Sequence, residues 1–146
     1  IWPLHCLIGT WGHSLVPDIA NALYNWEKDT FSRVNFTPKG SNYLSEHYSC
    51  VQADVQYDDD VSTKLNTSLI DSIKEADEIL TSGEALSHCL GTSITDIANN
   101  FGDDNIKKIT LLTDTSSSVT GFEQLGIDFV KNMTRRGMKI SNTKDW

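Results

Sequence analysis

A chain of 146 residues with 38% hydrophobic and 22% charged side chains is long enough, and apolar enough, to bury the core of one globular domain. Its 20 acidic and 12 basic residues give a formal net charge of -8 without any cluster of Lys or Arg, which argues against nucleic acid or anionic lipid as the partner and favours a small molecule. No apolar run approaches the about 20 residues that cross a bilayer, so we expect no membrane span.

The first predicted element is a helix over residues 14–30, where apolar side chains recur at helical spacing behind Ser14 as the expected N-cap. Residues 33–37 alternate apolar and polar side chains and stop at a Pro-Lys-Gly turn, which predicts a short strand with Lys39 at its carboxyl end. The polar and acidic stretch 41–62 predicts a long surface loop. Its run of three Asp residues lacks the ligand spacing of a calcium site, and we interpret it as solvated.

Helices and strands alternate along the rest of the chain. The pattern predicts a helix around 65–73 capped by Ser62 or Thr63, strands at 78–81, 108–113 and 138–140, and helices at 87–100 and 122–133. This order predicts a three-layer α/β/α fold with a mainly parallel sheet, in a single domain over residues 1–146. Ligands bind beyond the carboxyl ends of such strands, which points to Lys39, residues 83–89 and Asp114.

Cys89 is the residue most typical of a reactive site. It falls in the first turn of a predicted helix, where the dipole and unpaired N–H groups favour a thiolate and can also hold an oxyanion. Lys39, at the end of the neighbouring strand, would stabilise that thiolate and move protons. The alternatives are a small buried cysteine and an ordinary surface lysine. His5 is either a metal ligand or a structural histidine.

Three cysteines at wide spacings fit neither a disulfide framework nor a zinc ribbon, so we expect a reducing, cytoplasmic setting. The chain opens on Ile1-Trp2-Pro3 without an initiating Met or a leader, and we expect further residues upstream of it.

Four stretches of the sequence resemble, in order, the isochorismatase-like cysteine hydrolases, and within that superfamily the nicotinamidases most of all. They are the Trp-Pro-x-His-Cys-x-x-Gly-Thr-x-Gly stretch of residues 2–12, Lys39-Gly40, Tyr48-Ser49, and the Gly-x-Ala-x-x-x-Cys-Leu stretch of residues 83–90. Each of the two longer stretches is fairly specific, and the resemblance extends over nearly the whole chain.

The resemblance implies a role for each matching residue. Cys89 matches the nucleophile, which attacks the carboxamide carbon, releases ammonia and forms a thioester that water hydrolyses. Lys39 matches the lysine that supports the thiolate. The amides of Ala85 and Cys89 match the oxyanion hole, and the bond between Glu84 and Ala85 matches a cis peptide of the family.

The resemblance also implies a metal site and a substrate pocket. His5 matches a ligand of a divalent metal, typically zinc, that anchors the pyridine nitrogen of nicotinamide. Trp2 matches a wall of the pocket, and Glu84 and His88 are the other expected substrate-binding residues. His88 stands where nicotinamidases often carry an aromatic side chain, which leaves room for a different amide.

The main departure from the family lies upstream of the Trp-Pro motif with which this chain begins. There the family carries its catalytic Asp, at the end of the first strand, and an Asp-x-His pair of metal ligands after the second. We therefore expect the chain to be the C-terminal portion of a longer enzyme, without the first strands of the sheet. A sheet without its first strand exposes an apolar edge, so we expect that edge to bind a partner. A complementing N-terminal segment or another copy of the chain would be this partner and would supply the missing groups.

The leading hypothesis is a metal-assisted cysteine amidohydrolase that converts nicotinamide to nicotinate and ammonia in NAD salvage. One alternative is a hydrolase of the same fold acting on another small amide or an isochorismate-like substrate, against which His5 argues because such relatives often lack the metal. The other is a non-catalytic fragment or pseudoenzyme that serves as a binding module. The presence of Cys89, Lys39 and His5 together argues against a module without chemistry.

Overall fold

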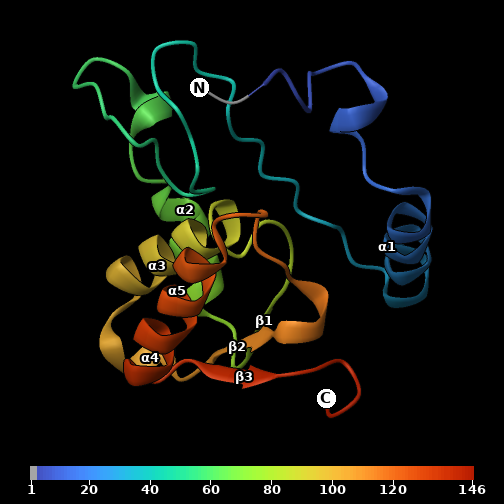
Figure 1. Cartoon of the computed structure of the whole chain (residues 1–146). Coiled ribbons are helices and arrows are strands. Elements are labelled where there is room, and N and C mark those ends of the chain that lie inside the picture. The colour runs from blue at the N-terminus through green and yellow to red at the C-terminus, as the bar shows by residue number, and fades with distance from the viewer. Residues whose placement is uncertain (1–2) are drawn as a thin grey trace. The chain divides into compact units, whose positions relative to one another are not determined.

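The computed structural model of the chain describes residues 3–146 in two units, Ile1–Thr37 and Pro38–Trp146 (Figure 1). The smaller unit contains the 3-10 helix η1 (Trp11–His13) and the helix α1 (Pro17–Thr30). The larger unit contains, in chain order, η2 (Val61–Thr63), α2 (Thr67–Lys74), β1 (Ile79–Thr81), α3 (Cys89–Phe101), α4 (Asp103–Ile106), β2 (Ile109–Leu112), η3 (Thr113–Thr115), α5 (Glu123–Arg135) and β3 (Lys139–Ser141).

Helix α1 confirms the first predicted helix, but it starts later than expected. Its first residue is Pro17, and Val16 rather than Ser14 is the N-cap. Proline is favoured at the first position of a helix, because its fixed φ suits the helix and its missing N–H would have no intrahelical partner there. The proline therefore decides where the helix begins.

The strand predicted at residues 33–37 is wrong. These residues are extended but form no strand, and the N–H of Val34 donates to the Glu27 carboxylate at 2.7 Å. Alternating side chains describe the two faces that a strand would have, whereas a strand also requires a neighbour to pair with. Lys39 consequently follows an irregular segment and not a strand.

The three strands form one parallel sheet in the order β1-β2-β3 and confirm the predicted parallel α/β class. Ile79 of β1 lies in register with Ile109 of β2, and Leu111 of β2 with Ile140 of β3. Parallel neighbours require a crossover, and helices α3 and α5 fall in these two connections as the alternating pattern predicts. The short helix α4 was not predicted.

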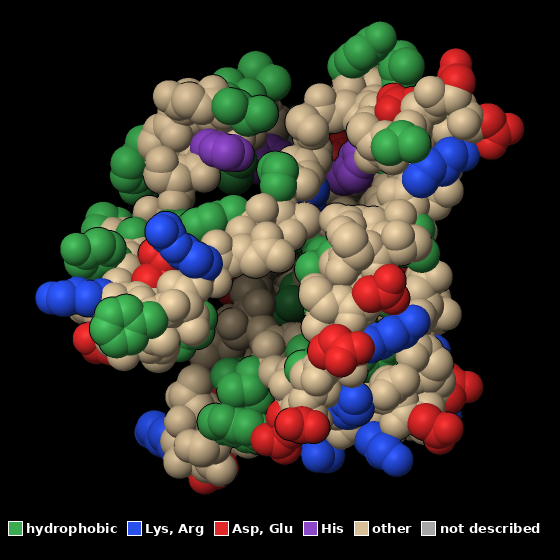
Figure 2. Space-filling view, turned by 180° about the vertical axis from the view of Figure 1, so that it is seen from behind, with side chains coloured by type: hydrophobic (Ala, Val, Ile, Leu, Met, Phe, Trp, Pro, Cys, Tyr) green, Lys and Arg blue, Asp and Glu red, His purple; other side chains and the backbone are tan. Residues whose placement is uncertain are grey.

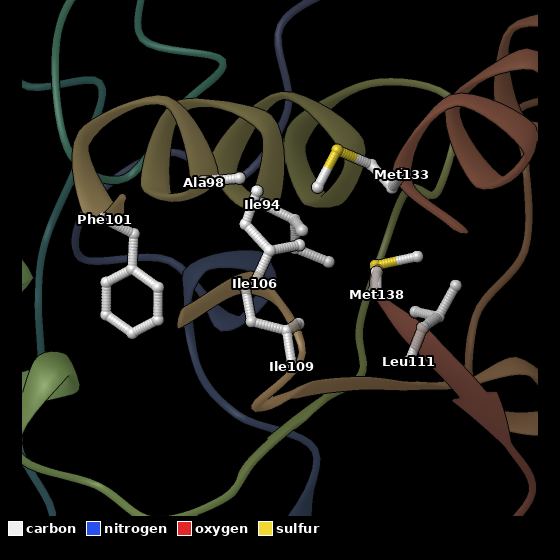
Figure 3. Packing of buried hydrophobic residues seen from close by; sticks show 8 residues of the cluster. All are labelled: Ile94, Ala98, Phe101, Ile106, Ile109, Leu111, Met133 and Met138. Carbon is white, nitrogen blue, oxygen red and sulfur yellow. The ribbon is translucent and has the colours of Figure 1, made fainter. Parts of the chain in front are cut away.

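The hydrophobic core lies on one face of β2. Ile109 and Leu111 are two residues apart and point to the same face, where both are almost completely buried. The core residues that pack with them come from α3, α4, α5 and the position just before β3: Ile94, Ala98, Phe101, Ile106, Met133 and Met138 (Figure 3). Full burial of each large aliphatic side chain stabilises the fold by about 1.5–3 kcal/mol.

Helix α2 confirms the helix predicted after the acidic stretch, with a different cap. Neither Ser62 nor Thr63 caps it. Asn66 does, since its side chain accepts a hydrogen bond from the N–H of Leu69 at 3.1 Å. Asn satisfies an unpaired N–H of the first turn as well as Ser does, so sequence rules could not separate the candidates.

The stretch 41–62 is an irregular excursion, as predicted, but it is not simply a surface loop. Val51 and Ala53 are buried, and so are the polar residues Ser45, His47 and Ser49. Backbone polar groups can be buried only when they are paired, and here Asn66 donates to the Val51 carbonyl at 2.7 Å. The excursion is therefore an ordered part of the larger unit.

Gly91 of α3 leaves no room for a side chain. A Cβ built there would lie 2.5 Å from the Leu86 carbonyl oxygen and 3.2 Å from a ring carbon of Phe129. We expect Gly91→Ala to lower the free energy of unfolding by about 1–3 kcal/mol, because a backbone oxygen cannot move aside cheaply. Urea unfolding measures the change. Gly12→Ala is the matched control, since its Cβ would meet nothing closer than 3.9 Å, and equal stability of the two variants would contradict the close approach.

None of the helices in residues 3–146 combines the length and the apolar character that crossing a membrane requires.

Candidate active site

Cys89 is the first residue of α3, where the chain enters the helix from β1 through the 82–88 turn. Its side chain is partly buried and carries a free thiol. Among the residues that the structure describes, the backbone amides of Ala85 and Cys89 donate to no other backbone group. Unpaired amides beside a nucleophile are the donors that a developing oxyanion requires.

Lys39 lies beside this thiol. Its Nζ is 3.5 Å from the Cys89 Sγ and also donates to the backbone carbonyl of His47 at 2.7 Å. The carbonyl fixes the end of a flexible side chain, so the ammonium stays next to the sulfur. A positive charge next to the sulfur is typical of reactive cysteines.

The irregular excursion that follows Lys39 leaves this residue next to the start of α3, which lies 50 residues further along the chain. The N–H of Cys50 donates to Ser93 Oγ on α3 at 3.0 Å, and His47 and Val51 are buried on either side of this contact. Each ring nitrogen of His47 lies 3.4 Å from a carbonyl oxygen, one of Ser45 and one of Ser62. His47, whose carbonyl accepts from Lys39, is thus itself in contact with both ends of the excursion, at Ser45 and at Ser62.

The turn that follows β1 is tied to the segment that follows β2. The N–H of Leu86 donates to the Ser117 carbonyl at 2.7 Å, and the Glu84 carboxylate accepts from the N–H of Ser117 at 3.1 Å and from its hydroxyl at 2.9 Å. The Glu84–Ala85 peptide bond is cis, as the resemblance implied. Glu84 is predicted to bind substrate, and in the structure its carboxylate accepts hydrogen bonds from Ser117.

His88 is the N-cap residue of α3 and precedes the thiol directly. Its ring meets the Phe122 ring edge-on at a centroid distance of 5.1 Å and lies 5.8 Å from the Tyr48 ring. Two segments far from His88 in the sequence, around Tyr48 and Phe122, therefore meet at the imidazole next to Cys89. No sequence rule singled out Phe122 for this position.

His5 belongs to the smaller unit, where its Nδ1 lies 2.7 Å from the Pro3 carbonyl oxygen. Within residues 3–146 no group of three or more His, Cys, Asp and Glu side chains forms a metal site. Zinc in proteins takes at least three protein ligands. The described residues therefore do not fit a zinc site by themselves. Trp2 lies outside the described residues.

Two carboxylates near these segments are held by hydrogen bonds. The hydroxyl of Thr143 donates to Asp114 at 2.5 Å and lowers its pKa, which ties the C-terminal segment to the end of β2. Hydrogen bonds from Ser62, and then from Asn42, lower the pKa of Asp60 below its ordinary value of 3.8. Asp60 thus stabilises the 41–62 excursion through these hydrogen bonds. Its neighbours Asp58 and Asp59 are exposed, as predicted.

The hydrogen bonds to the Asp60 carboxylate make the excursion sensitive to acid. A carboxyl whose pKa is lowered on folding contributes stability above its unfolded value, and that stability is lost as the pH falls through the folded pKa. We therefore expect Asp60→Ala to lower the thermal midpoint at neutral pH, with a difference from the unmodified protein that shrinks below about pH 3.8. Thermal scans between neutral pH and pH 3 measure it. Asp59→Ala is the control, and a constant difference at every pH would contradict this role.

Three solved structures share this arrangement of the chain. The yeast nicotinamidase Pnc1p superimposes with a TM-score of 0.71 at 20% identity, and its complex with the inhibitor nicotinaldehyde with 0.72 at 18%. Both comparisons cover 97% of this chain. A nicotinamidase and pyrazinamidase from Acinetobacter baumannii gives 0.66 at 18% over 99% of it. The chain has the nicotinamidase fold. No protein-family model and no curated sequence matches it.

The match confirms the fold that the sequence motifs suggested. The chain spans 58% of the length of the yeast nicotinamidase and 60% of the Acinetobacter protein. It thus corresponds to part of each, as the position of the Trp-Pro motif predicts.

The structure brings together Cys89, Lys39, Ala85 and His88, which the motifs had marked separately. Sequence reasoning missed the carbonyl of His47 and the 117–119 segment. Both act mainly through backbone groups, although the Ser117 hydroxyl also donates to Glu84. A backbone contact leaves no signature in side-chain type, so no sequence signal could have found them.

Proposed function

We propose that this chain is the thiol-bearing part of a cysteine hydrolase that cleaves small amides to a carboxylate and ammonia, with nicotinamide as the leading substrate. The observation that supports the proposal most is the 3.5 Å approach of the Lys39 ammonium to the Cys89 sulfur at the start of α3. The amides of Ala85 and Cys89, which donate to no other backbone group within residues 3–146, support it further, and so does a fold shared with nicotinamidases.

The reaction begins with attack of the Cys89 thiolate on the carboxamide carbon. The carbonyl oxygen becomes an oxyanion, which the amides of Ala85 and Cys89 stabilise. When the C–N bond breaks, the Lys39 ammonium donates a proton to the leaving nitrogen, so ammonia departs and a thioester remains on Cys89.

Water then hydrolyses the thioester. The neutral amine of Lys39 takes a proton from the attacking water, the C–S bond breaks, and the sulfur leaves as a thiolate. The product leaves as a carboxylic acid, which passes its proton to ammonia, so that a carboxylate and ammonium result and the Lys39 ammonium and the Cys89 thiolate are restored. The family's Asp would share this proton transfer if a complementing segment or another copy supplies it.

The proposal includes a site for a divalent metal, typically zinc. His5 would be one of its ligands, and the other ligands would come from outside the described residues. The three free cysteines support a reducing, cytoplasmic setting. On the face shown in Figure 2, Lys and Arg side chains are interspersed with Asp and Glu, which favours a small substrate over nucleic acid.

Ammonia release by the purified protein tests the proposal. Intact mass under denaturing conditions first establishes whether residues beyond the 16.3 kDa chain are present. The sample is then assayed with nicotinamide, benzamide and isochorismate, each with and without added zinc. We expect ammonia from nicotinamide and its stimulation by zinc.

Ammonia from another amide but not from nicotinamide would assign the same chemistry to a different substrate. Consumption of isochorismate alone would contradict an amidase. If the full-length, zinc-treated protein acts on none of these compounds, the hydrolase proposal is wrong, and the binding-module hypothesis replaces it.

A further inference from the structure

The chain on both sides of Ala85 is tied to a single residue, Ser117. On one side, the Glu84 carboxylate accepts from the Ser117 N–H at 3.1 Å and from the Ser117 hydroxyl at 2.9 Å. On the other side, the N–H of Leu86 donates to the Ser117 carbonyl at 2.7 Å. Ser117 lies 33 residues beyond Glu84, so a distant segment holds the turn before and after Ala85.

The carbonyl of Ala85 is held by the start of α3. It accepts from the N–H of His88 at 2.9 Å and from the N–H of Leu90 at 3.1 Å. The N–H of Ala85 donates to no other backbone group within residues 3–146. An amide whose neighbours are fixed keeps one direction. Such a preorganised donor stabilises an oxyanion without having to reorganise during the reaction.

The carboxylate of Glu84 is committed to Ser117. Both of its oxygens take part, because the Ser117 N–H lies 3.1 Å from Oε1 and 3.3 Å from Oε2, and the hydroxyl donates to Oε2. Hydrogen bonds to a charged oxygen are stronger than those between neutral groups. A carboxylate that turned toward a substrate would have to give these bonds up, so the geometry argues against a direct contact.

We infer that Glu84 is a positioning residue of the oxyanion hole and does not bind the substrate. Its carboxylate and the Leu86 N–H hold Ser117 from both sides of Ala85, and this bridge fixes the direction of the Ala85 N–H. The inference rests on the proposed function, because an oxyanion forms only when Cys89 attacks an acyl carbon. It replaces the substrate-binding role expected for Glu84.

Steady-state kinetics with nicotinamide separate positioning from binding. We expect Glu84→Ala to lower kcat by about five- to fiftyfold and to change KM by less than about twofold, because an oxyanion donor acts in the transition state. Glu84→Gln should keep kcat within about threefold, since its amide can accept from the Ser117 N–H and donate to the Ser117 hydroxyl oxygen. Asp103→Ala removes an exposed carboxylate that accepts from Arg136 beyond the far end of α3, and should change nothing.

Three outcomes of these assays would overturn the inference. An unchanged kcat in Glu84→Ala would show that the bridge does not matter for the reaction. A raised KM with an unchanged kcat would show that Glu84 binds the substrate directly. A Glu84→Gln variant as impaired as Glu84→Ala would show that the charge of Glu84 matters and its hold on Ser117 does not.

Ser117→Ala tests the partner, because it removes the hydroxyl and keeps the backbone N–H and carbonyl. We expect kcat to fall by about two- to fivefold when Glu84 is present and to stay constant when Glu84 is already alanine. Effects that simply multiply in the double variant would overturn the bridge.

Two further measurements need no substrate. Iodoacetamide should alkylate Cys89 in Glu84→Ala within about twofold of the normal rate, since the contact with Lys39 is intact, and a large fall would place the effect on the thiol. Amide hydrogen exchange at Leu86 should be about three- to tenfold faster in Glu84→Ala and normal in Glu84→Gln. If the unmodified protein hydrolyses no amide, the proposed function fails separately. Equal exchange at Leu86 in all three proteins overturns the positioning role in either case.

Discussion

Replacement of Cys89 by Ser is expected to lower kcat/KM for nicotinamide by at least about a thousandfold. The proposed reaction passes through a thioester, and a serine hydroxyl placed at the start of α3 beside Lys39 remains protonated and a poor nucleophile. Ammonia release measures the loss. Mass spectrometry of the unmodified protein, quenched during turnover, is expected to show the acyl adduct on the peptide that contains Cys89.

Cys50 provides the matched control, since it is also a free and partly buried cysteine of the larger unit. Its N–H bonds to Ser93, and Cys50→Ser keeps that backbone contact, so activity should stay within about twofold. A Cys89→Ser variant with normal turnover would mean that the nucleophile lies elsewhere and that the motif resemblance misassigned it.

Lys39→Met is expected to lower kcat/KM by about 10²–10⁴-fold, because it removes both the cation beside the thiolate and the group that moves the protons. The same variant should slow the reaction of Cys89 with iodoacetamide at neutral pH, a measurement that needs neither substrate nor metal. Methionine retains most of the length of the lysine side chain, so the surrounding packing is largely preserved.

Lys64→Met is the control for removing a positive charge at the edge of the 41–62 excursion, because Lys64 lies just beyond it and pairs with the exposed carboxylate of Asp58 at 3.0 Å. An exposed pair contributes little, and neither activity nor alkylation should change. Equal alkylation rates in the Lys39→Met variant and the unmodified protein would show that the 3.5 Å contact does not activate the thiol.

Local patterns in the sequence predicted most of the elements of the larger unit. The periodicity of 87–100 and 122–133 predicted α3 and α5, and the apolar run at 108–113 predicted the buried central strand β2. These predictions succeed because a helix and a buried strand each require a characteristic spacing of apolar residues, which is visible in the sequence. The motif around Cys89 succeeded for a related reason, since a thiol at the start of a helix after a strand is defined by local order alone.

Where a segment depended on a distant partner, the sequence was insufficient. Residues 33–37 alternate like a strand but pair with none, and the stretch 41–62 looks solvated although it buries His47 and Val51. Both outcomes depend on which surfaces meet in the folded chain, and that information is not contained in local periodicity.

The sequence by itself determined the parallel α/β class and the position of the thiol at a helix start. Lys39 was named as its partner by the motif resemblance, whereas the strand predicted at 33–37 to carry it was wrong. Only the tertiary structure decided how that partner arrives, through the carbonyl of His47, and how the imidazole of His88 is held, through the hydroxyl of Ser87 and the N–H of Val119. The physical reason is that two of these contacts, at the His47 carbonyl and at the Val119 N–H, use backbone groups, which every residue has. Their pairing is set by the fold and not by the type of side chain.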